Sequence, residues 1–218
     1  MKTQLAIFDL DGTLLDTIDD LAAAADHVLA VRSLPRHTTE AYRQMVGGGI
    51  RMLMRRALPE HLRTDEYIDR CLADFVAYYT ENIDRRTRPY EGIKQLLTEL
   101  SRRGVKMAVA SNKFQAGTER LVGRFFPDAG FVAVSGNREG MPLKPDAAVV
   151  EQIIARAGVD RSGVVMIGDS GVDIATARNA EIRSIGVTWG FRSREELAAA
   201  GADEIVSTAD ELREAILG

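Results

Sequence analysis

Three aspartates follow the first apolar run of this chain. In the stretch AIFDLDGTLLDT (6–17), Asp9 and Asp11 come directly after apolar residues, and Asp16 follows them. Carboxylates are costly to bury unless something compensates their charge. Clustered carboxylates also repel one another, and a hard, oxygen-preferring cation such as Mg²⁺ relieves that repulsion. The stretch is therefore either an ordinary exit from a strand or a place where a cation and a reaction meet.

Other polar residues occupy comparable positions further along the chain. Ser111 and Asn112 follow the apolar run KMAVA, and Asp169 follows VVMIG. Lys144 lies in the sequence LKPD, just after another apolar run. A lysine and a hydroxyl that face one point suit a phosphoryl group, whose charge spreads over its equatorial oxygens in the transition state.

These residue types together suit phosphoryl transfer. Asp9 can attack phosphorus as the nucleophile and carry the phosphoryl group as an aspartyl-phosphate. Asp11, two residues further on, projects to the same side and can serve as general acid and base. Gly12 lets the backbone turn sharply beside the phosphate. The residues thus predict an enzyme that uses Mg²⁺ and acts on a small phosphorylated metabolite.

The elements that must position these residues are short strands alternating with helices. The apolar runs predict strands at 5–10, 106–111, 131–136, 164–169, 184–188 and 204–207, with helices at 91–103, 115–125, 146–157, 172–180 and 193–200. This alternation predicts an α/β fold with a doubly wound, Rossmann-like parallel sheet, whose strands are buried on both faces. The carboxyl ends of such strands share one edge, where ligands bind. The polar residues should therefore meet at that edge.

One long segment interrupts the alternation. From about Asp16 to Arg88 only helical periodicity is found, and in 65–83 the apolar residues fall on one face at three- and four-residue steps. We predict an α-helical cap domain over 16–88, inserted into a core domain made of 1–15 and 89–218.

Composition excludes several classes of function. The chain has 218 residues, 45% of them hydrophobic and 28% charged, with a formal net charge of −4. The negative charge argues against nucleic acid or an anionic membrane as partner, and no apolar run is long enough to span a bilayer. Cys71 is the single cysteine, which predicts a buried thiol and a cytoplasmic protein. The sequence leaves monomer and homodimer open.

The order of the motifs DLDGTLLDT, ASNK, LKPD and GDSGVDIATA resembles that of the haloacid dehalogenase superfamily. The resemblance extends over the whole chain and implies a hydrolase with a helical cap. It implies that Asp9 is the nucleophile and a Mg²⁺ ligand. It also implies that Asp11 is the general acid and base and binds the metal through its backbone carbonyl.

The same resemblance assigns roles to the later motifs. Ser111, the backbone of Asn112 and the amine of Lys144 are expected to hold the phosphate. Asp169 is expected to complete the metal site. Asp173 is expected to support either the metal ligands or Lys144.

Within the superfamily, several activities can be excluded. The dehalogenases lack an acid at the position of Asp11, so its presence favours phosphoryl transfer. The phosphonoacetaldehyde hydrolases need a lysine in the cap, and residues 14–90 contain none. A small-molecule phosphatase or phosphomutase remains, and a phosphatase with 2-phosphoglycolate as its substrate is the leading expectation. The alternatives are a sugar phosphomutase of the β-phosphoglucomutase kind, a pyrophosphatase, a nucleoside monophosphatase or, as a non-enzyme, a phospho-accepting receiver module.

The stretch VGGGIRMLMRRAL (46–58) is similar to the cap of phosphoglycolate phosphatases. A glycine-rich turn with Gly47 and Gly49 at a helix start offers N–H groups to an anion. Arg51 or Arg56, with Arg55 as a further candidate, can pair with a substrate carboxylate. The alternative is a flexible turn followed by a solvated arginine face.

The sequence also departs from that group of phosphatases. Glu91 and Glu181 stand where it has a proline and a glycine. Of the remaining polar residues, Lys113 is expected to be solvated, and Trp189 to pack beside the site. The acids Asp16, Asp19 and Asp20 are expected to cap and charge the first helix of the insertion.

Overall fold

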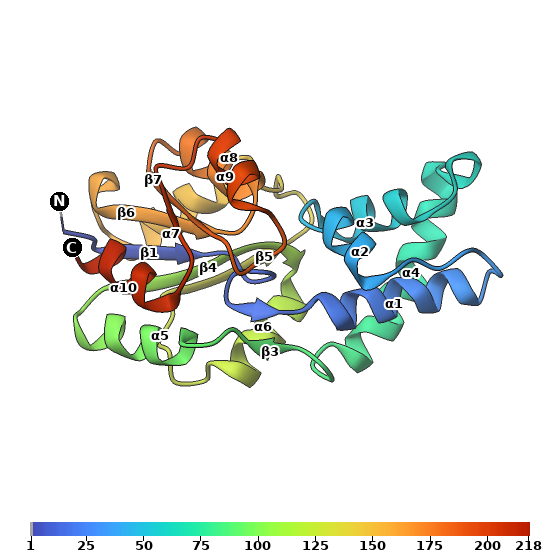
Figure 1. The fold of residues 1–218 in the computed structure, drawn as a ribbon, viewed down its shortest axis with the longest axis horizontal. Helices are drawn as coiled ribbons and strands as arrows, with labels where there is room; N and C mark the ends of the chain where they lie inside the picture. Colours follow the sequence, from blue (N-terminus) through green and yellow to red (C-terminus); the bar gives the residue numbers. More distant parts are fainter. Residues whose placement is uncertain (1) are drawn as a thin grey trace. The chain divides into compact units, whose positions relative to one another are not determined.

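The computed structural model describes residues 2–218, and its main sheet has six parallel strands in the order β5-β4-β1-β6-β7-β8 (Figure 1). The strands are β1 (Leu5–Phe8), β4 (Lys106–Phe114), β5 (Ala133–Asn137), β6 (Val164–Gly168), β7 (Arg183–Val187) and β8 (Glu204–Val206). Successive strands add outward on either side of β1, so the strand order reverses there. This arrangement confirms the predicted doubly wound α/β fold, in which ligands bind where the strand order reverses, here at the carboxyl end of β1.

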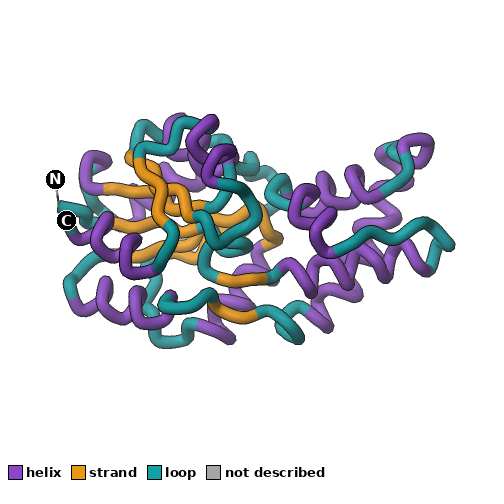
Figure 2. The backbone as a smooth tube through the Cα atoms, viewed as in Figure 1, coloured by secondary structure: helices purple, strands orange, loops and turns teal. Residues whose placement is uncertain are grey.

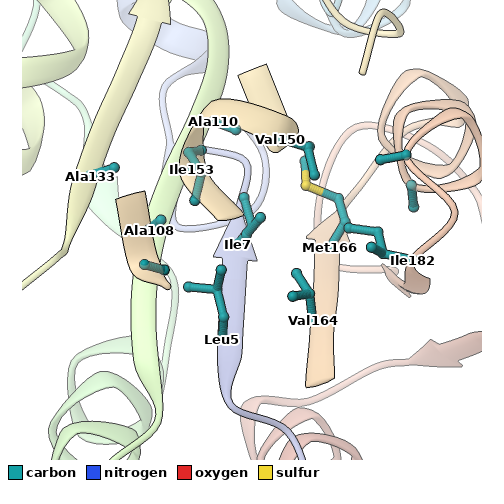
Figure 3. Close-up of a cluster of buried hydrophobic side chains, with 13 residues drawn as sticks. Leu5, Ile7, Ala108, Ala110, Ala133, Val150, Ile153, Val164, Met166 and Ile182 are labelled. Carbon is teal, nitrogen blue, oxygen red and sulfur yellow. The ribbon is translucent and has the colours of Figure 1, made fainter. Parts of the chain in front are cut away.

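Apolar side chains on both faces of the central strands are buried, which explains their uninterrupted apolar sequences. One face carries alternate residues of three neighbouring strands, as the two-residue period of a strand requires (Figure 3). They pack with residues of the surrounding helices in one cluster, which includes Leu5, Ile7, Ala108, Ala110, Val164, Met166, Val150, Ile153 and Ala177. The cluster fixes the strands whose ends carry the polar residues.

Six helices accompany this sheet: α5 (Ile93–Arg102), α6 (Gln115–Phe125), α7 (Ala148–Ala157), α8 (Gly171–Asn179), α9 (Arg194–Ala199) and α10 (Ala209–Leu217). The first five correspond to predicted helices, with ends that differ by a few residues. Helix α10 was not predicted, although Thr208 caps it by accepting a hydrogen bond from the Glu211 backbone N–H at 3.1 Å. The spacing of that threonine and glutamate is a helix-start signal that could have found it.

Residues Thr17–Arg88 form a second compact unit, distinct from Met1–Asp16 and Pro89–Gly218. Its helices are α1 (Ile18–Ala30), α2 (Thr39–Met45), α3 (Gly49–Ala57), the short η1 (Glu60–Leu62) and α4 (Asp65–Asn82). Figure 2 shows this unit as helices joined by loops. Helix α4 buries Ile68, Cys71, Phe75 and Tyr79 on one face, and it contacts α1 and α3. The Cys71 thiol is buried, as expected.

A small second sheet pairs β2 (Leu15–Asp16) with β3 (Arg88–Pro89), where the chain leaves and re-enters the larger unit. Among the described helices, none combines the length and the apolar character that a bilayer crossing needs.

Candidate active site

Asp9 comes directly after β1, at the carboxyl edge of the sheet. Its backbone N–H donates to the carbonyl of Ile167 on β6 at 2.9 Å, so its position is set by the central strand pair. The Asp9 side chain is 12% exposed, and its Oδ1 forms an ion pair with Lys144 Nζ at 2.9 Å. Burial raises the pKa of Asp9 to about 7, an effect that Lys144 opposes and that Asp173 and Asp11 reinforce.

Lys144 bridges two carboxylates. Besides Asp9, its Nζ contacts Asp173 Oδ1 at 2.6 Å, and the lysine side chain is only 3% exposed. Burial alone would lower the pKa of Lys144, but the charges of Asp173 and Asp9 outweigh it and raise that pKa above its usual value. Lys144 therefore stays a cation, which is the form that attracts a phosphoryl group.

Asp173 is fixed within the first turn of α8. Its Oδ2 accepts hydrogen bonds from the backbone N–H and the hydroxyl of Ser170, at 3.1 and 2.7 Å. A side chain at Gly168 would overlap Asp173, so the absence of a Cβ there makes room for the carboxylate. Since Lys144 occupies the other oxygen, both oxygens of Asp173 are engaged by protein groups. The geometry favours support of Lys144 over direct support of a metal.

Asp169 follows β6 and lies beside Asp9 at the sheet edge. Its Oδ2 accepts a hydrogen bond from the Phe191 backbone N–H at 2.7 Å, and the residue is 2% exposed. Burial, followed by the neighbouring charges of Asp173 and Asp9, raises the pKa of Asp169 well above its usual value. An added Cβ at Gly12 or at Gly190 would overlap the Asp169 side chain, so these glycines let the backbone close around it.

The acid cluster has the chemistry of a divalent cation site. Asp9, Asp169 and Asp173 each offer an oxygen, and these atoms lie within 4.8 Å of one another. Burial, followed by the charges of neighbouring carboxylates, raises the pKa values of Asp9 and Asp169, and a bound cation would favour the ionised form of both. Hard oxygen donors are the ligands of Mg²⁺. The residues present therefore fit a divalent metal.

Asp11 forms an ion pair with a buried lysine, Lys113. Lys113 Nζ lies 3.1 Å from Asp11 Oδ2, with the side chains 1% and 19% exposed, respectively. The expectation that Lys113 is solvated is wrong, because β4 continues past Ser111 to Phe114 and carries the lysine into the interior. The sequence signal was the lysine's place immediately after two polar residues at a strand end.

Asn112 fixes the loop that carries Lys144. Its Nδ2 donates to the Lys144 carbonyl at 3.0 Å, and its Oδ1 accepts from the Lys144 backbone N–H at 2.8 Å. The neighbouring Ser111 is buried, and its Oγ accepts a hydrogen bond from the Lys113 backbone N–H at 3.3 Å. The amide side chain of Asn112 thus positions the lysine, an arrangement between residues 32 positions apart that the sequence did not indicate.

Trp189 packs beside this edge of the sheet, in agreement with the expectation. Its Nε1 donates to the carbonyl of Thr13 at 3.0 Å, and its ring lies 6.4 Å from that of Tyr90. The indole therefore braces the loop that follows Asp11 and Gly12.

The arginines of the Thr17–Arg88 unit have different partners. Arg51 pairs with Asp65 at 3.1 Å and with Asp69, and Arg55 pairs with Asp65 at 2.8 Å. Arg56 donates to the carbonyl of Met45 at 2.9 Å. Gly47 and Gly49 flank the start of α3 with φ of 109° and 78°, a backbone conformation that favours glycine. The glycines therefore have a conformational role whether or not this turn meets an anion.

The acids of the insertion differ in part from the expectation. Thr17, not Asp16, is the N-cap residue of α1, and Asp19 and Asp20 lie in its first turn. Asp20 does more than charge the helix, because it is 3% exposed and accepts hydrogen bonds from Arg86 and Thr87. It ties the start of the unit to its end.

Comparison with known proteins identifies the family of this chain. A sequence model of the haloacid dehalogenase-like hydrolases matches residues 6–187. The chain belongs to this family. The family has the fold and the enzymatic class that the motifs predicted.

Relatives of this hydrolase cover most of its length. A phosphoglycolate phosphatase from Agrobacterium fabrum is 37% identical over 189 residues, which cover 86% of this chain and 81% of that protein. One from Mesorhizobium japonicum is 33% identical over 196 residues, covering 89% and 86%. A crystal structure from Lactobacillus delbrueckii subsp. bulgaricus, provisionally identified as a phosphoglycolate phosphatase, has a TM-score of 0.94 and 36% identity over 100% of both chains. These findings confirm the prediction of a phosphatase enzyme.

Proposed function

We propose that this phosphatase hydrolyses a small phosphomonoester in a Mg²⁺-dependent reaction, and that 2-phosphoglycolate is its substrate. The observation that carries the proposal is the placement of Asp9, with its carboxylate 2.9 Å from the Lys144 amine and beside the carboxylate of Asp169. A nucleophile, a phosphate-binding cation and a metal ligand thus lie together at the carboxyl edge of β1.

Asp9 attacks phosphorus, and the bond between phosphorus and the ester oxygen breaks as the aspartyl-phosphate forms. Asp11 gives a proton to the leaving oxygen, then takes a proton from the water that attacks the aspartyl-phosphate. Inorganic phosphate leaves and the Asp9 carboxylate is restored. Lys144 holds the phosphoryl oxygens together with Ser111 and the Asn112 backbone, and Asp173 keeps Lys144 in place.

The carboxylates of Asp9 and Asp169 and the backbone carbonyl of Asp11 would hold the Mg²⁺ ion. When bound, the ion supplies positive charge for the phosphoryl oxygens and offsets the repulsion between the two carboxylates. The raised pKa values of Asp9 and Asp169 support this assignment, because a cation favours the ionised form that both roles require.

The substrate assignment comes from the relatives and from the helical unit. Phosphoglycolate is the substrate in the names of the relatives. We assign Thr17–Arg88 as a cap domain that excludes water during turnover. Among the arginines of α3, Arg51 and Arg55 pair with aspartates, whereas Arg56 donates to a backbone carbonyl. Arg56 is therefore the best candidate to bind the substrate carboxylate.

A phosphate-release assay tests the proposal. Phosphoglycolate, sugar phosphates, nucleoside monophosphates and pyrophosphate are each incubated with the protein, with Mg²⁺ or with a chelator. We expect fastest release from phosphoglycolate with Mg²⁺ and loss of release with the chelator. An isomerised sugar phosphate in place of free phosphate would indicate a mutase, and activity indifferent to chelator would contradict the metal site.

Asp9→Asn keeps the shape of the side chain but removes the nucleophile, so we expect release to fall to background while the Tm stays close to that of the wild type. The matched control is Asp128→Asn, on an exposed loop residue, which should retain full activity. Substantial turnover by Asp9→Asn would rule out the aspartyl-phosphate route.

A further inference from the structure

Lys113 and Asp11 form an ion pair that the proposed roles of Asp9, Lys144 and Asp169 do not require. The lysine side chain is 1% exposed and the aspartate side chain 19%, with 3.1 Å between Nζ and Oδ2. Ion pairs with a buried member contribute little net stability, because desolvation opposes the attraction between the charges. Stabilisation of the fold is therefore a weak explanation for this pair, and its geometry has to be considered.

The two carboxylate oxygens of Asp11 differ in their surroundings. Lys113 holds Oδ2, whereas Oδ1 is buried and has no hydrogen-bond partner among residues 2–218. A carboxylate anchored at one oxygen cannot rotate freely, so the second oxygen keeps a defined direction. That direction matters for a group that must reach the leaving oxygen and later the attacking water.

The backbone of Lys113 is itself fixed. The hydroxyl of Thr118 on α6 donates to the Lys113 carbonyl at 3.2 Å. Gly136 on β5 approaches the same carbonyl so closely that an added Cβ would lie 2.6 Å from its oxygen. The pairing of β4 with β5 shifts register between Ala110 and Phe114.

This register shift explains how the consecutive residues Asn112 and Lys113 can both reach partners in the candidate active site. Successive side chains of a regular strand point to opposite faces, and an irregularity in the pairing redirects them. Here Asn112 reaches the Lys144 backbone, and Lys113 reaches Asp11. The irregular end of β4 therefore places a lysine on the general acid and base.

We propose that Lys113 is a positioning residue for Asp11, which aims the free oxygen of its carboxylate at the reacting oxygen atoms. This inference rests on the proposed function, in which Asp11 transfers the proton. Lys113 acts through Asp11 and does not itself touch the phosphoryl group. Its loss should therefore slow the chemical step without weakening substrate binding.

A double-mutant cycle tests this role. Lys113→Met keeps the length of the side chain and removes the charge, and we expect kcat to fall about 10- to 100-fold, within the range that general acid catalysis contributes, while KM changes less than about twofold. In an Asp11→Asn background the same substitution should change kcat by less than about twofold, because the group it positions is already absent. An equal loss in both backgrounds, or no loss in either, would overturn the proposal.

The matched control is Lys106→Met, which removes the same atoms from the other end of β4, where the lysine bonds to the carbonyl of Ala157. It should leave kcat unchanged. If Lys113→Met fails to fold, as judged by its circular dichroism spectrum, Lys113→Leu takes its place in the cycle, since it also removes the donor to Asp11.

Leaving-group dependence gives a second readout that a merely structural role would not move. Acetyl phosphate has acetate as its leaving group, and this carboxylate needs no proton, so kcat/KM for acetyl phosphate should fall much less in Lys113→Met than kcat/KM for phosphoglycolate. Equal losses for both compounds would contradict the role. Phosphate release by the wild type and by Asp9→Asn tests the proposed function by itself. A failure of the proposed function can therefore be told apart from a failure of the role proposed for Lys113.

Discussion

Gly12 combines a left-handed backbone conformation with close contact to Asp169, which we assign to the metal site. Its φ is 88°, in the region that favours glycine, and an added Cβ would overlap the carboxylate of Asp169. The conformation alone costs a residue with a Cβ about 1–2 kcal/mol. A Cβ at this position would also push the Asp169 carboxylate, which we assign to the metal, out of its place.

We expect Gly12→Ala to weaken Mg²⁺ binding at least about tenfold and to lower the free energy of unfolding by more than about 2 kcal/mol, because both costs apply. Isothermal titration calorimetry and denaturant unfolding measure the two effects. Gly104→Ala is the matched control, since Gly104 has φ of 75° and open space around it. It should show only the conformational cost, and equal metal affinity in both variants would contradict the overlap.

At the scale of elements, one connection depends on a single acid. Asp20 in the first turn of α1 accepts hydrogen bonds from the backbone N–H groups of Arg86 and Thr87, at 2.9 and 2.8 Å, and from the Thr87 hydroxyl at 2.8 Å. It is buried, so its oxygens depend on these donors for their hydrogen bonds. The start and the end of the Thr17–Arg88 unit are thereby joined through one carboxylate.

Asp20→Asn replaces an acceptor oxygen by an NH₂ group that faces donors, and we expect it to destabilise the protein by about 2–3 kcal/mol. Chemical denaturation followed by circular dichroism measures the loss. The neighbouring Asp19→Asn should cost less than about 1 kcal/mol, since it removes only a first-turn charge. Similar losses in the two variants would show that Asp20 acts only through the helix dipole.

Glu181 has an unusual backbone conformation at the end of a helix. Helix α8 ends in a pair of reversed hydrogen bonds, from Glu181 N–H to the Arg178 carbonyl at 3.0 Å and from Ile182 N–H to the Ala177 carbonyl at 3.0 Å. This motif places Glu181 at φ of 54°, where glycine is usual. The departure noted in the sequence is therefore a glutamate in a left-handed conformation.

Glu181→Gly should raise the Tm by about 1–4 °C, because release of the strained conformation outweighs the greater freedom of glycine in the unfolded chain. Differential scanning calorimetry measures this shift. Glu181→Ala removes the carboxylate but keeps the Cβ, so it should give a smaller gain. A gain in alanine as large as in glycine would assign the effect to the charge.

At the scale of the whole molecule, the acid cluster couples stability to pH and to metal. Burial raises the pKa of Asp9 from 3.8 to about 7. Between these values the folded chain retains a proton that the unfolded chain has lost, so the free energy of unfolding falls as the pH rises through this window. A metal ion competes with that proton and is favoured on the alkaline side.

Without metal, the contribution of this cluster should therefore lower the Tm between about pH 5 and about pH 8. Added Mg²⁺ should raise the Tm more at the higher pH, where the carboxylates are ionised. Thermal unfolding at both pH values, with chelator or with Mg²⁺, measures this difference. Asp169→Asn is the control and should lose most of the Mg²⁺ effect. An equal Mg²⁺ effect at the two pH values would contradict linkage through these acids.

The sequence by itself determined the α/β alternation, the helical character of the insertion and the catalytic acids as candidates, because apolar periodicity and motif spacing are local properties of the chain. Only the tertiary structure decided which polar groups are partners. The hydrogen bonds between Asn112 and Lys144 span 32 positions, and those that Asp20 accepts from Thr87 span 67. The place of Lys113 likewise depends on a shifted strand register. Such pairings arise from strand order and helix packing, so the types and spacing of neighbouring residues do not reveal them.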